Sequence, residues 1–115
     1  MEQKNKHQTR NYPIDVPHTI VINLTFNHEE YQKLILGLKP KEMENRWRIY
    51  FEDDTLCFLR SWTGYHVFDA KIQKEDNHYH IKEFLAERNP EKYKNTNDDY
   101  DINVISELIN KILNQ

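Results

Sequence analysis

Glycine and cysteine are scarce in this chain of 115 residues, which contains two glycines and one cysteine. So few glycines leave little room for loops that cradle phosphate with backbone amides, and neither G-x-x-x-x-G-K-[ST] nor G-x-G-x-x-G occurs. A single cysteine, Cys57, excludes an internal disulfide and the paired-cysteine spacing of zinc motifs. The sequence therefore predicts a site built from side chains rather than from a backbone loop.

Long apolar runs are also missing. No stretch approaches the roughly 20 apolar residues that a membrane-spanning helix needs, and no apolar segment near the amino terminus resembles a signal peptide. The formal net charge of -3 argues against a protein that binds long nucleic acids by neutralising phosphates. We therefore expect a cytoplasmic protein whose partners include neither a membrane nor a long nucleic acid, and whether it forms a homo-oligomer stays open.

The length and composition are those of one domain. With 115 residues, of which 37% are hydrophobic, the chain can build one core but not two lobes with a cleft between them. The polar segment 1–17, which contains Pro13 and Pro17, is expected to be an N-terminal tail. Residues 18–115 are then expected to form a single α+β domain.

Hydrophobic periodicity predicts the elements of that domain. Alternation of apolar and polar residues predicts strands, and apolar residues three and four apart predict helices. The expected strands are 18–26, 47–52, 55–59, 65–73 and 79–85. The expected helices are 28–38, with Asn27 as N-cap and Pro40 after its end, and 102–113, with Asp99 or Asp101 as cap. We expect an antiparallel sheet of about five strands with the two helices packed on one face.

The segment Arg60-Ser61-Trp62-Thr63-Gly64 gathers the groups that a phosphorylated aromatic ligand needs. A guanidinium grips phosphate through a planar fork, an indole stacks on a base, and two hydroxyls can hydrogen-bond phosphate or ribose. Two alternatives stay open, because Trp62 can instead fill the core and Arg60 can form a structural salt bridge. The candidate partners in that salt bridge are Asp53, Asp69 and Glu83.

Three further residues, Tyr50, His66 and Arg88, complete the predicted ligand site. On adjoining strands, Tyr50, Tyr65 and Tyr79 can form an aromatic shelf for a base, with ordinary cross-strand pairing as the alternative. Arg88 belongs to an irregular polar segment, and loops on a rigid scaffold often carry function. Turn-setting and capping roles for the polar residues of that segment are the alternative.

Recognisable catalytic and metal motifs are absent from the sequence. Cys57 is expected in mid-strand as a small buried hydrophobe without an evident base. The alternatives are a metal site formed by His66, His78 and His80, and a hydrolase that uses Asp69 or Asp101 with His66. We expect no catalytic residue, no metal and no cofactor, which favours a binding protein over an enzyme.

Several segments together resemble a small bacterial and phage family. The resemblance rests on 47–52, 60–64, Arg88-Asn89-Pro90 with Tyr93, and 98–101, in a pattern of the form YFED…RSWTG…RNPEKY…DDYD. Members of that family occur near ADP-ribose-processing proteins, so the resemblance implies a connection with ADP-ribose without defining an activity. Relatives commonly carry a histidine before Arg-Ser-Trp, where this chain has Leu59. This departure favours binding over catalysis.

The sequence therefore predicts a small module that binds, and acts by sequestering, a nucleotide-type ligand such as an ADP-ribose derivative or a cyclic nucleotide signal. Phage anti-defence proteins act in this way. The alternative is a protein-binding inhibitor or immunity protein, whose acidic surface and exposed aromatic residues would occupy the basic site of a protein target.

Overall fold

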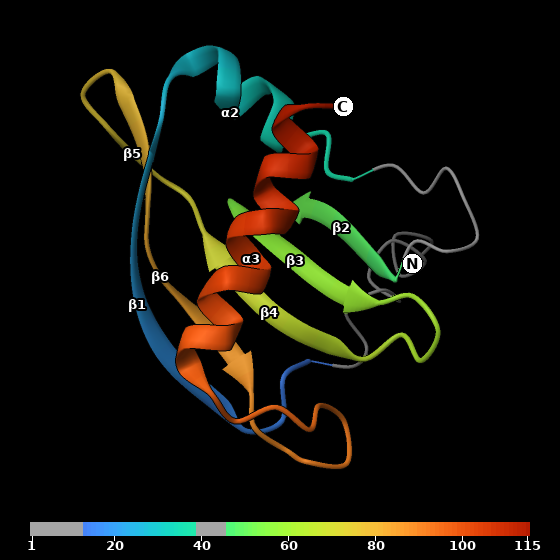
Figure 1. Cartoon of the computed structure of the whole chain (residues 1–115). Helices are drawn as coiled ribbons and strands as arrows, with labels where there is room; N and C mark the ends of the chain where they lie inside the picture. Colours follow the sequence, from blue (N-terminus) through green and yellow to red (C-terminus); the bar gives the residue numbers. More distant parts are fainter. Residues whose placement is uncertain (1–12, 39–45) are drawn as a thin grey trace, which may run out of the picture.

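The computed structural model describes residues 13–38 and 46–115, which form an α+β fold with a six-stranded sheet (Figure 1). The strands are β1 (Pro17–Phe26), β2 (Trp47–Glu52), β3 (Thr55–Arg60), β4 (His66–Lys71), β5 (Gln73–Glu75) and β6 (His78–Glu87). The helices in these ranges are α2 (His28–Leu34) and α3 (Asp98–Leu113). The predicted fold class and the antiparallel sheet are confirmed.

The sheet is ordered β1-β6-β4-β3-β2, with β5 paired to β6, and each of these pairs is antiparallel. Asp53 and Asp54 connect β2 to β3 with φ values of 55° and 62°, as a two-residue hairpin turn with positive φ requires. The predicted strand 65–73 is divided into β4 and β5. The division occurs at Ile72, whose side chain is buried and whose backbone N–H donates to the Asp54 carbonyl.

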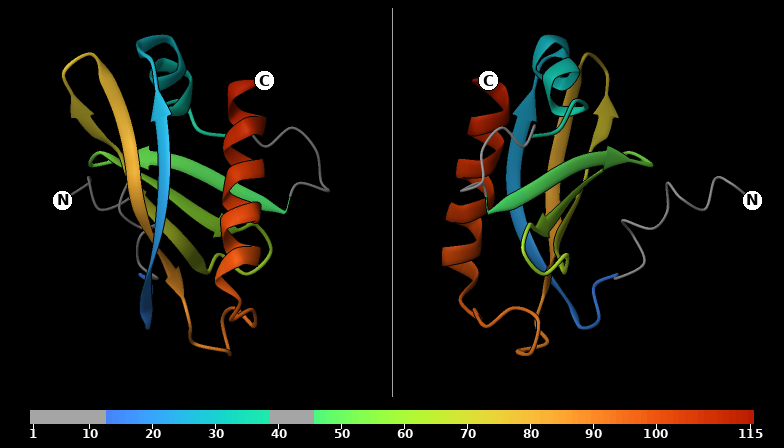
Figure 2. Two further views of the ribbon diagram at one scale, coloured as in Figure 1. Left: turned by 60° about the vertical axis from the view of Figure 1, so that its left-hand side comes forward. Right: turned by 90° about the vertical axis from the view of Figure 1, so that its right-hand side faces the viewer.

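Helix α3 lies across one face of the sheet, as Figures 1 and 2 show. Its predicted apolar stripe is buried in the same core as the strand residues Phe58 and Phe68. The buried residues of the stripe are Ile105, Leu108, Ile109 and Ile112. Burial of this stripe against the sheet stabilises the helix more than its intrinsic propensity does.

The start of α3 differs from the prediction. The N-cap is Asn97, whose side chain accepts a hydrogen bond from the Tyr100 backbone N–H at 3.0 Å. The two predicted caps, Asp99 and Asp101, lie within the first turn of the helix. Both Asn and Asp serve well as N-caps, so the sequence alone did not distinguish these neighbouring candidates.

Helix α2 begins where predicted and ends earlier. Its capping box is formed, because Asn27 and Glu30 exchange hydrogen bonds of 2.8 and 2.9 Å between side chain and backbone. The helix ends at Leu34 rather than at 38. Gly37 then adopts a φ of 72°, and a Cβ there would lie 2.2 Å from the Ile49 carbonyl oxygen. Glycine thus allows the chain to approach β2 closely after the helix.

The first described residues are attached to the end of β6. The carboxylate of Glu87 is fully buried and accepts hydrogen bonds from the backbone N–H groups of Asp15, Val16 and Asn89 at 2.8, 2.9 and 3.0 Å. Residues 15 and 16 of the predicted tail therefore contact the domain, while residues 1–12 lie outside the described ranges.

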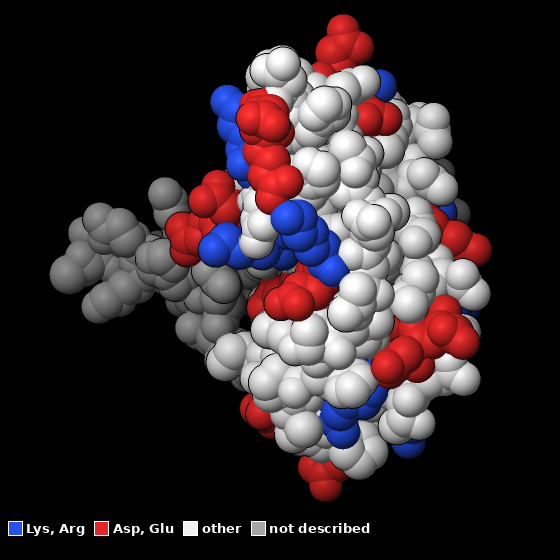
Figure 3. Space-filling view, turned by 90° about the vertical axis from the view of Figure 1, so that its left-hand side faces the viewer, with Lys and Arg blue, Asp and Glu red and all other residues white. Residues whose placement is uncertain are grey.

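Charges of both signs alternate on the side of the molecule formed by the edge strand β1 and the β5–β6 hairpin (Figure 3). Lys82 and Glu75, for example, are joined there by an ion pair of 2.5 Å. This face of the described chain therefore offers no continuous basic stripe. Across the two described ranges, neither helix has the length and apolar character needed to cross a membrane.

Candidate ligand-binding site

A cavity of about 520 Å³ opens where β3 ends. Its walls come from the end of β3 and the segment after it, from the loop before α3 and from the first turn of α3. The lining residues are Arg60, Trp62, Thr63, Tyr65, Glu91, Lys92, Tyr93, Lys94, Asn95 and Tyr100. Three of these side chains are cationic and four are aromatic, and Arg60, Trp62 and Thr63 of the motif at 60–64 are among them.

A tight turn after β3 shapes one wall of the cavity. The Gly64 N–H donates to the Arg60 carbonyl at 2.8 Å, and the Arg60 N–H donates to the Tyr65 carbonyl at 3.0 Å. Gly64 has a φ of 76°, a conformation that glycine adopts without steric cost. The turn directs Trp62 outward, where 83% of it is exposed. One alternative from the sequence placed Trp62 in the core, and its exposure contradicts that alternative.

Arg60 rests on an aromatic ring. Its guanidinium carbon lies 5.1 Å from the centroid of the Trp47 ring, within the range of a cation–π contact. Trp47 in turn stacks on Phe68, with 5.6 Å between the ring centroids. Of the predicted salt-bridge partners, Asp53 lies in the turn at the opposite end of β3 and Asp69 pairs with His66. Within the described ranges Arg60 belongs to no ion pair.

The two lysines of the cavity differ in their partners. The Lys92 ammonium lies 5.4 Å from the centroid of the Tyr65 ring and 2.9 Å from a carboxylate oxygen of Asp15. That hydrogen bond raises the pKa of Lys92 and lowers the pKa of Asp15, so both stay charged near neutral pH. Lys94 is exposed and has no ion pair within the part of the chain that the structure describes. Arg60 and Lys94 are therefore the cations that a ligand can approach.

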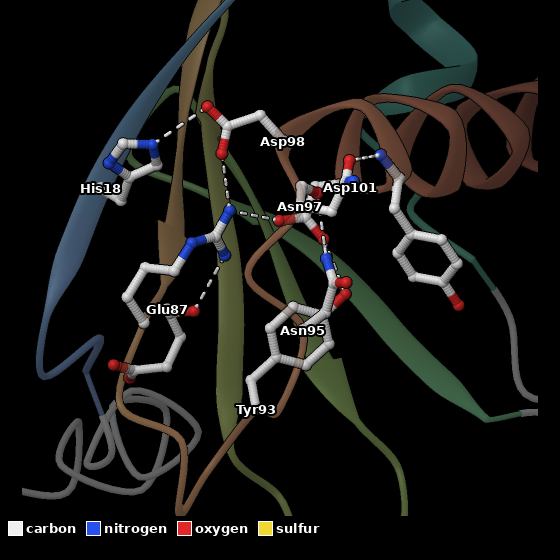
Figure 4. Close-up of polar contacts among 9 residues, drawn as sticks. His18, Glu87, Tyr93, Asn95, Asn97, Asp98 and Asp101 are labelled. Carbon is white, nitrogen blue, oxygen red and sulfur yellow. Dashed lines mark hydrogen bonds and ion pairs between the residues drawn. The ribbon is translucent and has the colours of Figure 1, made fainter.

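Asp101 of α3 holds the loop that forms one side of the cavity (Figure 4). Its fully buried carboxylate accepts hydrogen bonds from Arg88 and the Tyr93 hydroxyl, each at 2.7 Å, and from the Asn95 amide at 2.9 Å. Burial and this hydrogen bond raise the pKa of Tyr93, so the phenol remains a donor. Because Tyr93 and Asn95 also line the cavity, this network fixes two of its lining residues to α3.

Arg88, predicted to bind ligand, belongs to this structural network. Its side chain is 12% exposed and donates both to Asp101 and, at 3.0 Å, to Asp98, which also pairs with His18 at 3.1 Å. Burial lowers the pKa of Arg88, but the hydrogen bonds to the two carboxylates outweigh it and the pKa lies above its ordinary value. The guanidinium is thus already matched by carboxylates of the fold, and Arg88 does not line the cavity.

The other predicted ligand residues lie apart from the cavity. Ser61 belongs to the turn and its N–H donates to the Arg46 carbonyl at 2.9 Å, but it does not line the cavity. Tyr50 and His66 lie on the face of the sheet opposite α3. The aromatic shelf is not assembled, because Tyr79 stacks on Tyr31 with 3.9 Å between ring centroids. The structure thus brings together Arg60, Trp62 and Thr63 from the predicted set.

Sequence reasoning missed the contribution of the loop at 91–95. The signal available was the run Lys92-Tyr93-Lys94, in which two cations flank an aromatic residue, but an irregular connection with a proline gave no position for it. Comparison of the chain with protein-family models, with curated proteins and with solved structures finds no match. The geometry of the cavity therefore carries the functional argument.

Proposed function

We propose that the cavity beside β3 binds a small nucleotide-type ligand, with ADP-ribose derivatives and cyclic nucleotide signals as the candidate classes. One observation carries the proposal: the cavity places the available cations Arg60 and Lys94 beside the exposed indole of Trp62. A phosphate needs charged donors and a base needs a flat ring on which to stack. The cavity volume of about 520 Å³ lies within the usual range of about 300–1,000 Å³ for small-molecule sites.

Six of the ten lining residues have a direct role in this proposal. Arg60 and Lys94 bind phosphate, and Trp62 stacks on the base, with the half-exposed Tyr100 as a second aromatic surface. The Thr63 oxygen accepts a hydrogen bond from the Tyr65 N–H at 3.2 Å, which leaves its hydroxyl hydrogen to donate to phosphate or ribose. The carboxylate of Glu91 is a suitable acceptor for ribose hydroxyls.

Preorganisation supports a binding role. The guanidinium of Arg60 rests on Trp47, and Tyr93 is held by the buried carboxylate of Asp101. Groups that are ordered before binding lose less conformational entropy when the ligand arrives. The described lining contains neither histidine nor cysteine, so a bound nucleotide is expected to be sequestered and released unchanged.

The first test uses the purified protein directly. We expect heat denaturation to release a stoichiometric nucleotide-type compound, identified by mass spectrometry. In calorimetry with ADP-ribose and with cyclic nucleotides, Arg60→Ala should weaken binding of the best ligand by about tenfold to hundredfold, as loss of a charged hydrogen bond implies. Arg48→Ala is the matched control, because Arg48 is an exposed arginine of β2 on the other face of the sheet.

Three outcomes contradict the proposal. Equal affinity of wild type and Arg60→Ala would remove the cavity from the binding site. A protein that carries no small molecule and co-purifies with another chain would favour the inhibitor alternative. Hydrolysed or transferred product at multiple turnovers, recovered after incubation and denaturation, would replace sequestration by catalysis.

A further inference from the structure

Cys57, His66 and Asp69 meet on the face of the sheet opposite α3. Cys57 of β3 and Asp69 of β4 are paired in the antiparallel register. In a regular strand, residues three apart point to opposite faces. A register shift between Phe58 and Leu59 interrupts the alternation in β4, because Phe58 pairs with Phe68 and Leu59 pairs with His66. His66 and Asp69 therefore point to the same side of the sheet and form a hydrogen bond. The thiol sulfur, a ring nitrogen and a carboxylate oxygen of the three residues all lie within 4.8 Å of one another.

Hydrogen bonds within the described protein satisfy one of the two ring nitrogens of His66. His66 is 2% exposed, and its Nε2 is bonded to Asp69 Oδ1. Its Nδ1 is buried and has no hydrogen-bond partner. A buried polar atom without a partner is uncommon in native proteins, and an unseen ion is among its regular explanations.

We propose that Cys57, His66 and Asp69 bind a divalent cation of the zinc class. The ligands are the Cys57 thiolate, a ring nitrogen of His66 and an oxygen of Asp69, with solvent as the fourth ligand. Thiolate, imidazole and carboxylate are the donors that Zn²⁺ takes in proteins. Given zinc–ligand distances of about 2.0–2.3 Å, tetrahedral ligands lie about 3.5 Å apart, so small side-chain movements close the site.

Charge balance supports this choice of ion. A thiolate and a carboxylate together neutralise a divalent cation, which lowers the cost of placing it among buried groups. On binding, the thiol proton of Cys57 passes to solvent, and the sulfur, the unpartnered lone pair of His66 Nδ1 and a carboxylate lone pair of Asp69 coordinate the metal. Affinity is therefore expected to fall as pH is lowered.

Burial distinguishes a metal site from a nucleophilic cysteine. Cys57 has no exposed surface, so a thiolate attack on an external substrate has no route. A metal ion needs only a narrow path. Asp69 is 21% exposed and lines a cavity of about 290 Å³, together with Thr55, Lys71 and Glu83, so the cluster reaches solvent through this carboxylate.

The test is cobalt titration of the full chain, prepared without a polyhistidine tag and treated with a chelator. Because Cys57 is the only cysteine of the sequence, a thiolate-to-cobalt charge-transfer band in the near ultraviolet can arise only from this residue. We expect one equivalent of Co²⁺ to produce the band, and Zn²⁺ to displace it and raise the melting temperature of the protein. The absence of the band in the wild-type chain overturns the proposal without any variant.

Substitutions identify the other ligands. Cys57→Ser should abolish the band, and Asp69→Asn should weaken Co²⁺ affinity by about tenfold or more. His78→Gln is the matched control, because His78 is exposed at the start of β6 and should leave the affinity unchanged. If Asp69→Asn and His66→Gln, each shown to be folded by circular dichroism, bind Co²⁺ as tightly as wild type, the proposed ligand set is wrong. Should His66→Gln not fold, Asp69→Asn decides alone.

Discussion

Two neighbouring regions, the Asp101 network and the cavity beside β3, use the same kinds of side chain and differ in whether the charges have partners. In the Asp101 network, Arg88 donates to two carboxylates of α3. In the cavity, Arg60 lies on an aromatic ring and has no carboxylate partner within the described ranges. The fold thus matches the charge of one of these two arginines with carboxylates and leaves the charge of the other without one.

Solvent exposure explains the difference. The Arg88 side chain is 12% exposed, and a charge removed from water must be paired to avoid a large desolvation penalty. Arg60 borders an open cavity and stays partly hydrated, so its charge does not need a carboxylate partner. The Asp101 network fixes the position of Tyr93 and Asn95, and the cavity that they line also contains Arg60 and Lys94. Four predictions test this division, ordered by the size of the expected effect.

The largest effect is expected from Asp101→Ala. Removing this carboxylate takes the acceptor from the buried Tyr93 hydroxyl and removes one acceptor each from Arg88 and Asn95. We expect the free energy of unfolding to fall by about 3–5 kcal/mol, measured by urea denaturation. Asp99→Ala, an exposed acid in the same helical turn, is the control and should cost at most about 1 kcal/mol. Similar losses for the two variants would show that Asp101 is not the anchor of the loop.

The second prediction concerns the packing of α3, on which both regions depend. Leu108→Ala removes a side chain that is 5% exposed and belongs to the core, so we expect a loss of about 2–5 kcal/mol in the free energy of unfolding. Asn110→Ala, at an exposed position of the same helix, is the control. Near-wild-type stability of Leu108→Ala would mean that this face of the helix is not packed as described.

A smaller change in the free energy of unfolding is expected on acidification, because Asp98 and its partner His18 lie near solvent. Hydrogen bonds from His18 and then Arg88 lower the pKa of Asp98, so its folded form binds a proton less readily than the unfolded chain. Its contribution to stability is therefore complete above the ordinary aspartate pKa of about 3.9 and is lost as pH falls below that value. Wild type should be more stable than Asp98→Asn at neutral pH. The gap should close at lower pH, and a gap that is constant in urea titrations across this range would contradict the prediction.

The smallest change in stability is expected at Trp62. Because 83% of this residue is exposed, Trp62→Ala should alter the free energy of unfolding by no more than about 0.5 kcal/mol. The same variant should lose about 1–3 kcal/mol of ligand affinity if the indole stacks on a base. A large loss of stability with unchanged affinity, measured by urea denaturation and calorimetry, would assign Trp62 to the fold rather than to the site.

Much of the fold and part of the site followed from neighbours in the sequence. Alternating residues identified β2 at its observed bounds, and the Asn27–Glu30 capping box marked the start of α2. These signals are local, because side-chain periodicity and capping depend on residues a few positions apart. The chemical character of Arg60 and Trp62 also followed from residue type alone.

The tertiary structure decided which of these side chains meet. Lys94 joins Arg60 across more than thirty residues of sequence, and the close approach of Ile49 explains the glycine conformation after α2. A register shift, which alternation does not predict, places His66 beside Asp69 and Cys57. Local pattern determined the elements because each forms through short-range contacts. Partners of a buried or exposed charge depend on how distant segments pack, and only the folded chain fixes that arrangement.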